Sequence, residues 1–278
     1  MPINALVNGS FSTSIDINDR GLAYGDGLFE TIKINQGSPE FLSLHIQRLQ
    51  QGCSRLGIHC DLQAIERDIE KLLPSVAGKN TVLKIIVTRE SKGRGYKPDA
   101  SAASNRILSV EPVTNDYTAE HKQGIAVRLC NTRLGINPQL AGIKHLSRLE
   151  NVLARGEWSD SAIAEGFMLD ADGRLVEGTM SNIFMVKDNT LLTPNLHRCG
   201  VDGVMRQVVI HQLAPELKLN ATTADLTMED IYQAAEVFIC NSLMGVVPVV
   251  AIGCHTKNIG TITRSLQQAL LQASHINA

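Results

Sequence analysis

Lys144 has the clearest capacity for covalent chemistry in this sequence. It lies in the segment 142–146, between a loop and a stretch of helical periodicity, and apolar Ile143 precedes it. A lysine held in an apolar site has a lowered pKa, so that its amine can attack a carbonyl carbon. A solvated lysine at the start of a helix fits the same local pattern. This segment alone therefore leaves both interpretations open.

Two further charged residues could bind an ionic group. Glu177 ends a short apolar segment immediately before Gly178 and Thr179. It could pair with a cationic nitrogen, or it could be an ordinary carboxylate of an edge strand. Arg48 lies beside the apolar stripe of a predicted helix, where it could face solvent. Its guanidinium could also bind a phosphate through a fork of donors.

Two glycine-flanked loops, at 25–27 and 93–95, are candidates for binding loops. Neither matches the glycine spacing of a dinucleotide-binding turn or a phosphate-binding P-loop, so we exclude a nucleotide site on this basis. Both loops also fit ordinary turns. The second loop places Arg94 between two glycines, and Tyr96 follows it directly.

Hydrophobic periodicity predicts the elements that must position these residues. Helices are expected at 42–56, 62–73, 203–213, 228–234 and 260–273, and a further helix after Lys144 contains Leu146, Leu149, Val152 and Leu153. Asp61 is the expected N-cap of the second of these helices. Strands are expected at 31–34, 82–88, 107–113, 124–130 and 236–240, with hairpins joining 167–169 to 175–177 and 183–186 to 191–193. The stretch 19–30 is expected to be a glycine-punctuated loop. Strands followed by helices, together with hairpins, indicate a mixed α/β (α+β) architecture with antiparallel sheet.

The length of 278 residues suggests two domains or one large one. We expect a small N-terminal α/β domain at 1–114, a polar linker at 115–123 and a larger C-terminal α/β domain at 124–278 that carries Lys144. Hydrophobic residues make up 44% of the chain, which argues against disorder.

Composition also limits the partners. The net charge of -2 gives no reason to expect nucleic acid or an anionic membrane. No apolar run approaches the ~18 residues of a membrane helix, and the N-terminus lacks a signal sequence, so a cytoplasmic protein is expected. The six cysteines include no C-x-x-C pair. We therefore expect reduced thiols and no metal site.

Taken together, the motifs resemble those of the fold type IV pyridoxal phosphate enzymes. Arg48, Lys144 and Glu177 occur in the order that this family shows, and the segments 24–31, 203–206 and 240–244 are also similar to family motifs. The family includes branched-chain aminotransferases, D-amino acid aminotransferases and aminodeoxychorismate lyases. The resemblance covers nearly the whole chain, and the combined motifs are far more specific than any one of them.

The resemblance implies a homodimer of two-domain subunits with pyridoxal 5'-phosphate in the interdomain cleft. Lys144 would be the catalytic residue and carry the cofactor, and Glu177 would keep the pyridine nitrogen protonated. The residues implied for the phosphate are Arg48, the amides of Val204 and Met205 at a helix start, the Ser242 hydroxyl and the Leu243 amide. The substrate pocket implied on the open face of the ring contains Tyr24, Phe29, Arg94 and Tyr96.

Within the family, the stretches 91–96, 133–150 and 241–244 look most like the lyases. D-amino acid aminotransferases typically have Arg-x-His where this chain has Arg94 and Tyr96. The lyase resemblance implies conversion of 4-amino-4-deoxychorismate to 4-aminobenzoate and pyruvate, for folate biosynthesis. An aminotransferase acting on D-amino or branched-chain amino acids is the alternative. A non-catalytic cofactor-binding protein is a third hypothesis, although cofactor storage would need neither Lys144 nor Glu177.

Overall fold

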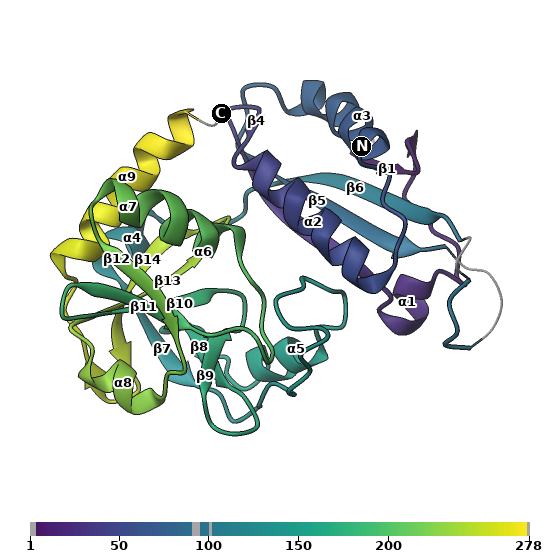
Figure 1. The fold of residues 1–278 in the computed structure, drawn as a ribbon. Coiled ribbons are helices and arrows are strands. Elements are labelled where there is room, and N and C mark those ends of the chain that lie inside the picture. Colours follow the sequence, from purple (N-terminus) through teal and green to yellow (C-terminus); the bar gives the residue numbers. More distant parts are fainter. Residues whose placement is uncertain (1–3, 91–94, 100–101, 277–278) are drawn as a thin grey trace. The chain divides into compact units, whose positions relative to one another are not determined.

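The structure is a computed structural model that describes residues 4–90, 95–99 and 102–276. By its contacts the chain divides into two compact units (Figure 1). The first extends to Thr114 and also includes Ile143–Ser147, whereas the second comprises Asn115–Gly142 and Arg148–Ile276. The segment that carries Lys144 therefore groups with the N-terminal unit, whereas the sequence predicts it in the C-terminal domain.

The N-terminal unit contains an antiparallel sheet whose described strands follow the order β2-β1-β6-β5-β3-β4. These strands are β1 (Ala5–Val7), β2 (Ser10–Phe11), β3 (Gly27–Asn35), β4 (Ser38–Pro39), β5 (Thr81–Arg89) and β6 (Ser104–Pro112). Along β3 the buried and partly exposed positions alternate, as the two faces of a strand require. Leu28, Ile32 and Ile34 lie on the buried face, and so does Glu30.

Two helices, α2 (Leu42–Leu56) and α3 (Leu62–Leu72), run across this sheet (Figure 1). Leu49 of α2 and Ile65 of α3 belong to one buried apolar cluster with residues of β3, β5 and β6. Gly57 ends α2 in the left-handed conformation, with φ of 61°. Asp61 caps α3, as predicted, by accepting a hydrogen bond from the Ala64 amide at 3.0 Å.

The C-terminal unit contains a mixed sheet, with nine strands among its described residues. Eight follow the order β12-β11-β10-β13-β14-β7-β8-β9, and β15 pairs with β14. The strands are β7 (Ile125–Leu129), β8 (Ile163–Leu169), β9 (Leu175–Gly178), β10 (Asn182–Lys187), β11 (Thr190–Pro194), β12 (Asn220–Ala224), β13 (Glu236–Asn241), β14 (Gly245–Ile252) and β15 (His255–Thr256). Both predicted hairpins, β8–β9 and β10–β11, are confirmed as antiparallel pairs.

The helices of the C-terminal unit are α4 (Thr118–Gln123), α5 (Leu149–Arg155), α6 (Val204–Val208), α7 (Ala214–Glu216), α8 (Met228–Gln233) and α9 (Thr261–Ile276). A π-helical turn, Val209–Leu213, joins α6 to α7 and makes one helical run of the three. Helix α4 occupies most of the segment predicted as a linker. Within the described residues, no helix is both long and apolar enough to cross a membrane.

The mixed α/β architecture predicted from the sequence is confirmed, but the segment after Lys144 differs from the prediction. The helix expected to include Leu146 begins only at Leu149. Before it, the backbone pairs with the start of β3: Phe29 donates to the Lys144 carbonyl at 3.1 Å, and Leu146 donates to the Gly27 carbonyl at 3.0 Å. This pairing requires an extended chain, so a tertiary contact overrides the local helical pattern.

Several other elements were not predicted. Helix α1 (Arg20–Tyr24) lies in the stretch expected to be a loop. It has only five residues, too few for periodicity to indicate a helix. Strands β12 and β14 were also missed, and β14 is buried for most of its length. A strand buried on both faces lacks the alternation by which strands are recognised.

Candidate active site

Lys144 is held against the first residues of β3. The two backbone hydrogen bonds described above flank an antiparallel bridge between Leu28 and His145. The Lys144 ammonium lies over the ring of Phe29, with Nζ 4.3 Å from the ring centroid. The structure thus brings together Lys144 and Phe29, two of the predicted site residues. The aromatic face of Phe29 covers one side of the amine.

Glu30 organises a buried ion cluster on the other face of the same strand. Its Oε1 accepts from Arg48 Nε at 2.8 Å, and its Oε2 accepts from Arg48 Nη2 at 2.5 Å. His45 Nδ1 lies 2.6 Å from Oε2. The Glu30 and His45 side chains are each 1% exposed. Arg48 therefore presents two of its nitrogens to Glu30 in a bidentate pair, which fixes the plane of the guanidinium.

The charges of this cluster follow from its burial. Burial alone raises the pKa of Glu30, but the charge of Arg48 and the hydrogen bonds from His45 and Arg48 outweigh it and lower the pKa to about 2. Burial lowers the pKa of His45 and outweighs the opposite effect of Glu30, and the charges of Arg48 and Lys144 lower it further. At neutral pH the cluster is therefore an ionised Glu30 paired with Arg48, to which a neutral His45 donates its Nδ1 hydrogen.

In the C-terminal unit, Glu177 lies at the end of β9 and is buried. Its Oε2 accepts from the Val201 amide at 2.8 Å. Asn182 holds the same loop from β10, since its Nδ2 donates to the Val201 carbonyl at 2.9 Å and its Oδ1 accepts from the Gly203 amide at 3.1 Å. Glu177 and Asn182 thus fix the loop that leads into α6. Position 203 is suited to glycine because an added Cβ would lie 2.1 Å from Asn182 Oδ1.

A second buried carboxylate, Glu165, fixes the turn that follows Glu177. Its oxygens accept from the Thr179 hydroxyl at 2.5 Å, the Thr179 amide at 3.1 Å and the Ser181 hydroxyl at 2.8 Å. A Cβ at Gly178 would lie 2.3 Å from Ser181 Oγ. The turn is therefore tightly packed, and the backbone on either side of Glu177 has a single well-defined course.

The predicted phosphate ligands of this unit lie at two places. Val204 and Met205 are buried and form the first turn of α6, where main-chain amides point out of the helix end. Ser242 and Leu243 lie in the turn between β13 and β14. There the Leu243 amide donates to Asn241 Oδ1 at 2.9 Å. A phosphate contact by this amide would have to share or replace that bond, a competition that the sequence alone does not reveal.

The predicted substrate residues are only partly described. Tyr24 ends α1, and its ring lies 5.4 Å from that of Tyr96 in a T-shaped arrangement. The exposed fractions of Tyr24 and Tyr96 are 45% and 84%. Arg94 lies outside the described residues. Of the predicted pocket, the structure therefore brings together Tyr24 with Tyr96, and separately Phe29 with Lys144.

Several residues of these clusters were not predicted, chiefly Glu30, His45 and Glu165. The signal for Glu30 is its place in the alternation of β3, since a carboxylate on a core-facing position must find partners. His45 precedes Leu49 by four residues, and so lies on the apolar stripe of α2. Among the residues that the structure describes, no group of His, Cys, Asp or Glu could hold a metal ion.

The chain belongs to the amino-transferase class IV family, whose model matches residues 27–252. It is 36% identical to the aminodeoxychorismate lyase of Vibrio harveyi, over 94% of this chain and 97% of that protein. The crystal structure of the 4-amino-4-deoxychorismate lyase of Pseudomonas aeruginosa is similar with a TM-score of 0.93 and 43% identity, covering 96% of this chain and 98% of that one. A D-alanine aminotransferase of Bacillus licheniformis is 28% identical, over 92% of this chain and 90% of that protein.

The Glu30 cluster gives a pH-dependent contribution to stability. Because the folded pKa of Glu30, about 2, lies below its ordinary value of 4.5, the stabilisation is present above pH 4.5 and is lost as the pH falls through the folded value. A shift of this size corresponds to about 3 kcal/mol. Glu30→Gln should lower the free energy of unfolding by that order at pH 7, and the difference from wild type should shrink between pH 4.5 and 2.

Urea unfolding at several pH values measures this difference. Glu111→Gln is the matched control, because Glu111 is an exposed carboxylate of the same sheet. It should change the free energy of unfolding by less than about 0.5 kcal/mol at each pH. A deficit for Glu30→Gln that stays constant down to pH 2 would contradict the assignment.

Proposed function

We infer that this chain acts as a pyridoxal phosphate-dependent lyase. It converts 4-amino-4-deoxychorismate to 4-aminobenzoate and pyruvate, as a cytoplasmic homodimer serving folate biosynthesis. The observation that carries this inference is the match to the Pseudomonas aeruginosa lyase, which extends over almost the full length of both chains at 43% identity. The Vibrio harveyi lyase supports it independently.

The residues present fit the cofactor. Pyridoxal phosphate needs an amine, a carboxylate for its ring nitrogen and donors for a dianionic phosphate. The chain offers Lys144, the buried Glu177, the guanidinium of Arg48 and the amides that begin α6. Gly203 provides a close backbone approach at that helix start, because any side chain there would collide with Asn182. When bound, the cofactor would supply an electron-accepting ring conjugated to the substrate amine.

Lys144 carries out the proton transfers in this proposal. Its Nζ would hold the cofactor, and its amine would be free to act once the substrate amine is bound. The free amine then removes the proton from the carbon that bears the substrate nitrogen. The bond between the ring carbon and the enolpyruvyl oxygen breaks, the substrate ring becomes aromatic, and Lys144 returns the proton to the departing group as it becomes pyruvate.

Glu177 keeps the ring nitrogen protonated, and its hydrogen bond from Val201 holds the carboxylate in place for this task. Arg48 binds the phosphate. Its guanidinium plane is already set by the ion pair with Glu30, so little side-chain entropy is lost on binding. Val204, Met205, Ser242 and Leu243 complete the phosphate site, and Tyr24, Phe29, Arg94 and Tyr96 contact the substrate.

An aminotransferase is the second candidate, because proteins named as D-alanine and branched-chain aminotransferases are also similar over most of this chain. The two activities differ in their need for a second substrate. Purified protein should consume aminodeoxychorismate without a 2-oxo acid and release 4-aminobenzoate, which is fluorescent. Faster turnover of a D-amino or branched-chain amino acid paired with a 2-oxo acid would favour the aminotransferase.

Lys144→Ala should abolish turnover and the covalent attachment of the cofactor. The physical reason is that the Lys144 amine would both form the bond to the carbonyl carbon and return a proton from the same atom, and an alanine side chain can do neither. Borohydride reduction of wild-type protein, followed by peptide mapping, should place the pyridoxyl label on Lys144. A label on Lys33 or Lys84 instead would refute the assignment. Lys33→Ala serves as the control for general loss of a lysine in the same unit.

Glu177→Gln should lower kcat by roughly two to three orders of magnitude, which corresponds to ~3–4 kcal/mol, while cofactor is still bound. Glutamine preserves the shape and can still accept the bond from Val201, but it removes the charge that holds the ring nitrogen protonated. Steady-state kinetics and titration of apo-protein with cofactor separate the two effects. Wild-type turnover in this variant would exclude the role.

A further inference from the structure

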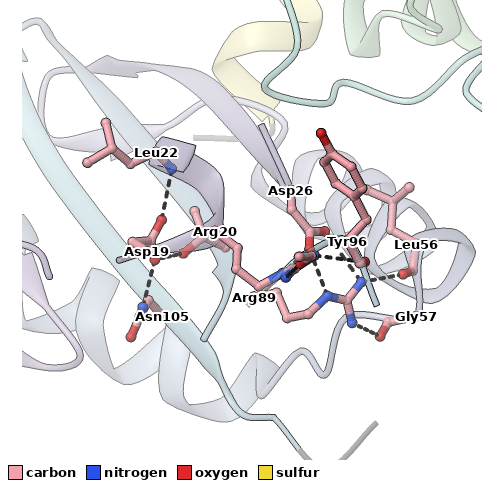
Figure 2. Close-up of polar contacts among 11 residues, drawn as sticks. Asp19, Arg20, Leu22, Asp26, Leu56, Gly57, Arg89, Tyr96 and Asn105 are labelled. Carbon is pink, nitrogen blue, oxygen red and sulfur yellow. Dashed lines mark hydrogen bonds and ion pairs between the residues drawn. The ribbon is translucent and has the colours of Figure 1, made fainter. Parts of the chain in front are cut away.

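A second ion network lies in the N-terminal unit, centred on Asp26 (Figure 2). Its Oδ2 accepts from Arg20 Nε at 2.8 Å and from Arg89 Nε at 2.9 Å. The two arginine side chains are 7% and 8% exposed. Burial raises the pKa of Asp26, but the hydrogen bonds and charges of Arg89 and Arg20 outweigh it and lower the pKa. One ionised carboxylate thus joins two buried cations.

Arg89 connects this network to the end of α2. Its Nη1 donates to the Gly57 carbonyl at 2.6 Å, and its Nη2 donates to the Leu56 carbonyl at 2.7 Å. These carbonyls lie at the helix C-terminus, where a cation is favourable. Because β5 contributes Arg89 and α2 is packed on the sheet, this end of the network is rigid.

Arg20 is fixed just as firmly at its backbone. Asp19, the residue before it, caps α1 by accepting from the Leu22 amide at 3.1 Å. Asp19 also accepts from the Thr88 hydroxyl at 2.6 Å and from Asn105 Nδ2 at 2.7 Å, which ties the start of α1 to β5 and β6. The side chain of Arg20 therefore extends from a well-defined point.

The remaining nitrogens of Arg20 bind the backbone of an exposed segment. Nη1 donates to the Gly95 carbonyl at 2.9 Å, and Nη2 donates to the Tyr96 carbonyl at 3.1 Å. Among the described residues, these are the hydrogen bonds that reach the backbone of Gly95 and Tyr96. Gly95 has φ of 82°, and Tyr96 is 84% exposed. Arg20 therefore ties the backbone of both residues to the ion network.

The same guanidinium lies over the ring of Tyr24, 5.0 Å from its centroid, and Tyr24 in turn contacts the ring of Tyr96. Arg20 thus touches one predicted substrate residue by its face and holds another by its backbone. Arg20 can therefore affect substrate binding without touching the substrate. It would do so by setting the positions of the Tyr24 and Tyr96 side chains.

We propose that Arg20 is a positioning residue for substrate binding. By clamping the Gly95 and Tyr96 carbonyls to the Asp26–Arg89 ion pair, it places the two tyrosine rings where a planar, carboxylated ring substrate is bound. The proposal rests on the proposed function for the identity of that substrate. It assigns no contact between Arg20 and the substrate or the cofactor.

Arg20→Met and Arg20→Lys test this role in the full chain loaded with pyridoxal phosphate. Methionine keeps the length of the side chain but removes the charge and the fork. Lysine keeps the charge beside Asp26 but cannot hold Asp26 and both carbonyls at once. We expect the KM for aminodeoxychorismate to rise about tenfold in Arg20→Met and about threefold in Arg20→Lys. The kcat should change less than about twofold, and cofactor affinity should equal that of wild type.

Chymotrypsin cleavage after Tyr96, mapped by mass spectrometry, gives a readout that needs no substrate. Arg20→Met should release the segment. Native Arg20→Met should then be cleaved after Tyr96 at least about fivefold faster than native wild-type protein. Arg106→Met is the matched control, since Arg106 is a partly buried arginine of the same unit whose side chain pairs with Asp68 at 3.1 Å and not with Asp26. It should leave the KM and the cleavage rate at wild-type values. Comparing the thermal unfolding midpoints of the two variants shows whether a general loss of stability explains any faster cleavage.

The two readouts separate the proposals. A wild-type KM, or a fall in kcat alone, in Arg20→Met would overturn the positioning role. If the wild-type protein does not consume aminodeoxychorismate, the proposed function fails, and the cleavage experiment then decides: unchanged cleavage in both Arg20 variants overturns the clamp, whereas faster cleavage supports it. Should Arg20→Met fail to fold, Arg20→Lys decides by the same criteria.

Discussion

The burial of one carboxylate, Glu30, constrains much of the N-terminal unit. An ionised carboxylate that is 1% exposed is strongly destabilising unless it is paired and hydrogen-bonded. Here His45 and Arg48 supply the partners from successive turns of α2, at positions three residues apart on one helix face. The requirement fixes the rotation of α2 against the sheet. It also gives Arg48 a defined orientation, so that the side-chain entropy needed to orient this cation is lost on folding and not on ligand binding.

Strand β3 connects this cluster with Lys144. Glu30 lies on its buried face, the neighbouring Phe29 contacts the Lys144 side chain, and the start of the strand pairs with the backbone around His145. A shift of β3 by one residue would exchange its two faces and separate all of these groups from their partners. The continuous pairing of β3 with β5 from Gly27 to Ile34 opposes such a shift.

The sequence was sufficient where local chemistry decides the structure. The Asp61 cap and the hairpin at Asp170 depend on residues close in the chain, and both were predicted. The extended course of Lys144 was not, because it follows from pairing with a strand more than a hundred residues earlier. The roles of Lys144 and Glu177 came from the family resemblance. Glu30 and Arg20 carry ordinary local patterns, and only the tertiary structure brings their partners within hydrogen-bonding distance.

The pairing of Ile143–Ser147 with the N-terminal unit has a consequence for how the chain acquires its structure. The strands of the first sheet are complete once residue 112 has been made, but the contact at Leu28 must wait for His145 to leave the ribosome. Closing so long a loop is entropically costly and is expected late in folding. The chain passes from the second unit to the first before Lys144 and back again after it. A single continuous gene fragment that ends at residue 114 would therefore lack Lys144.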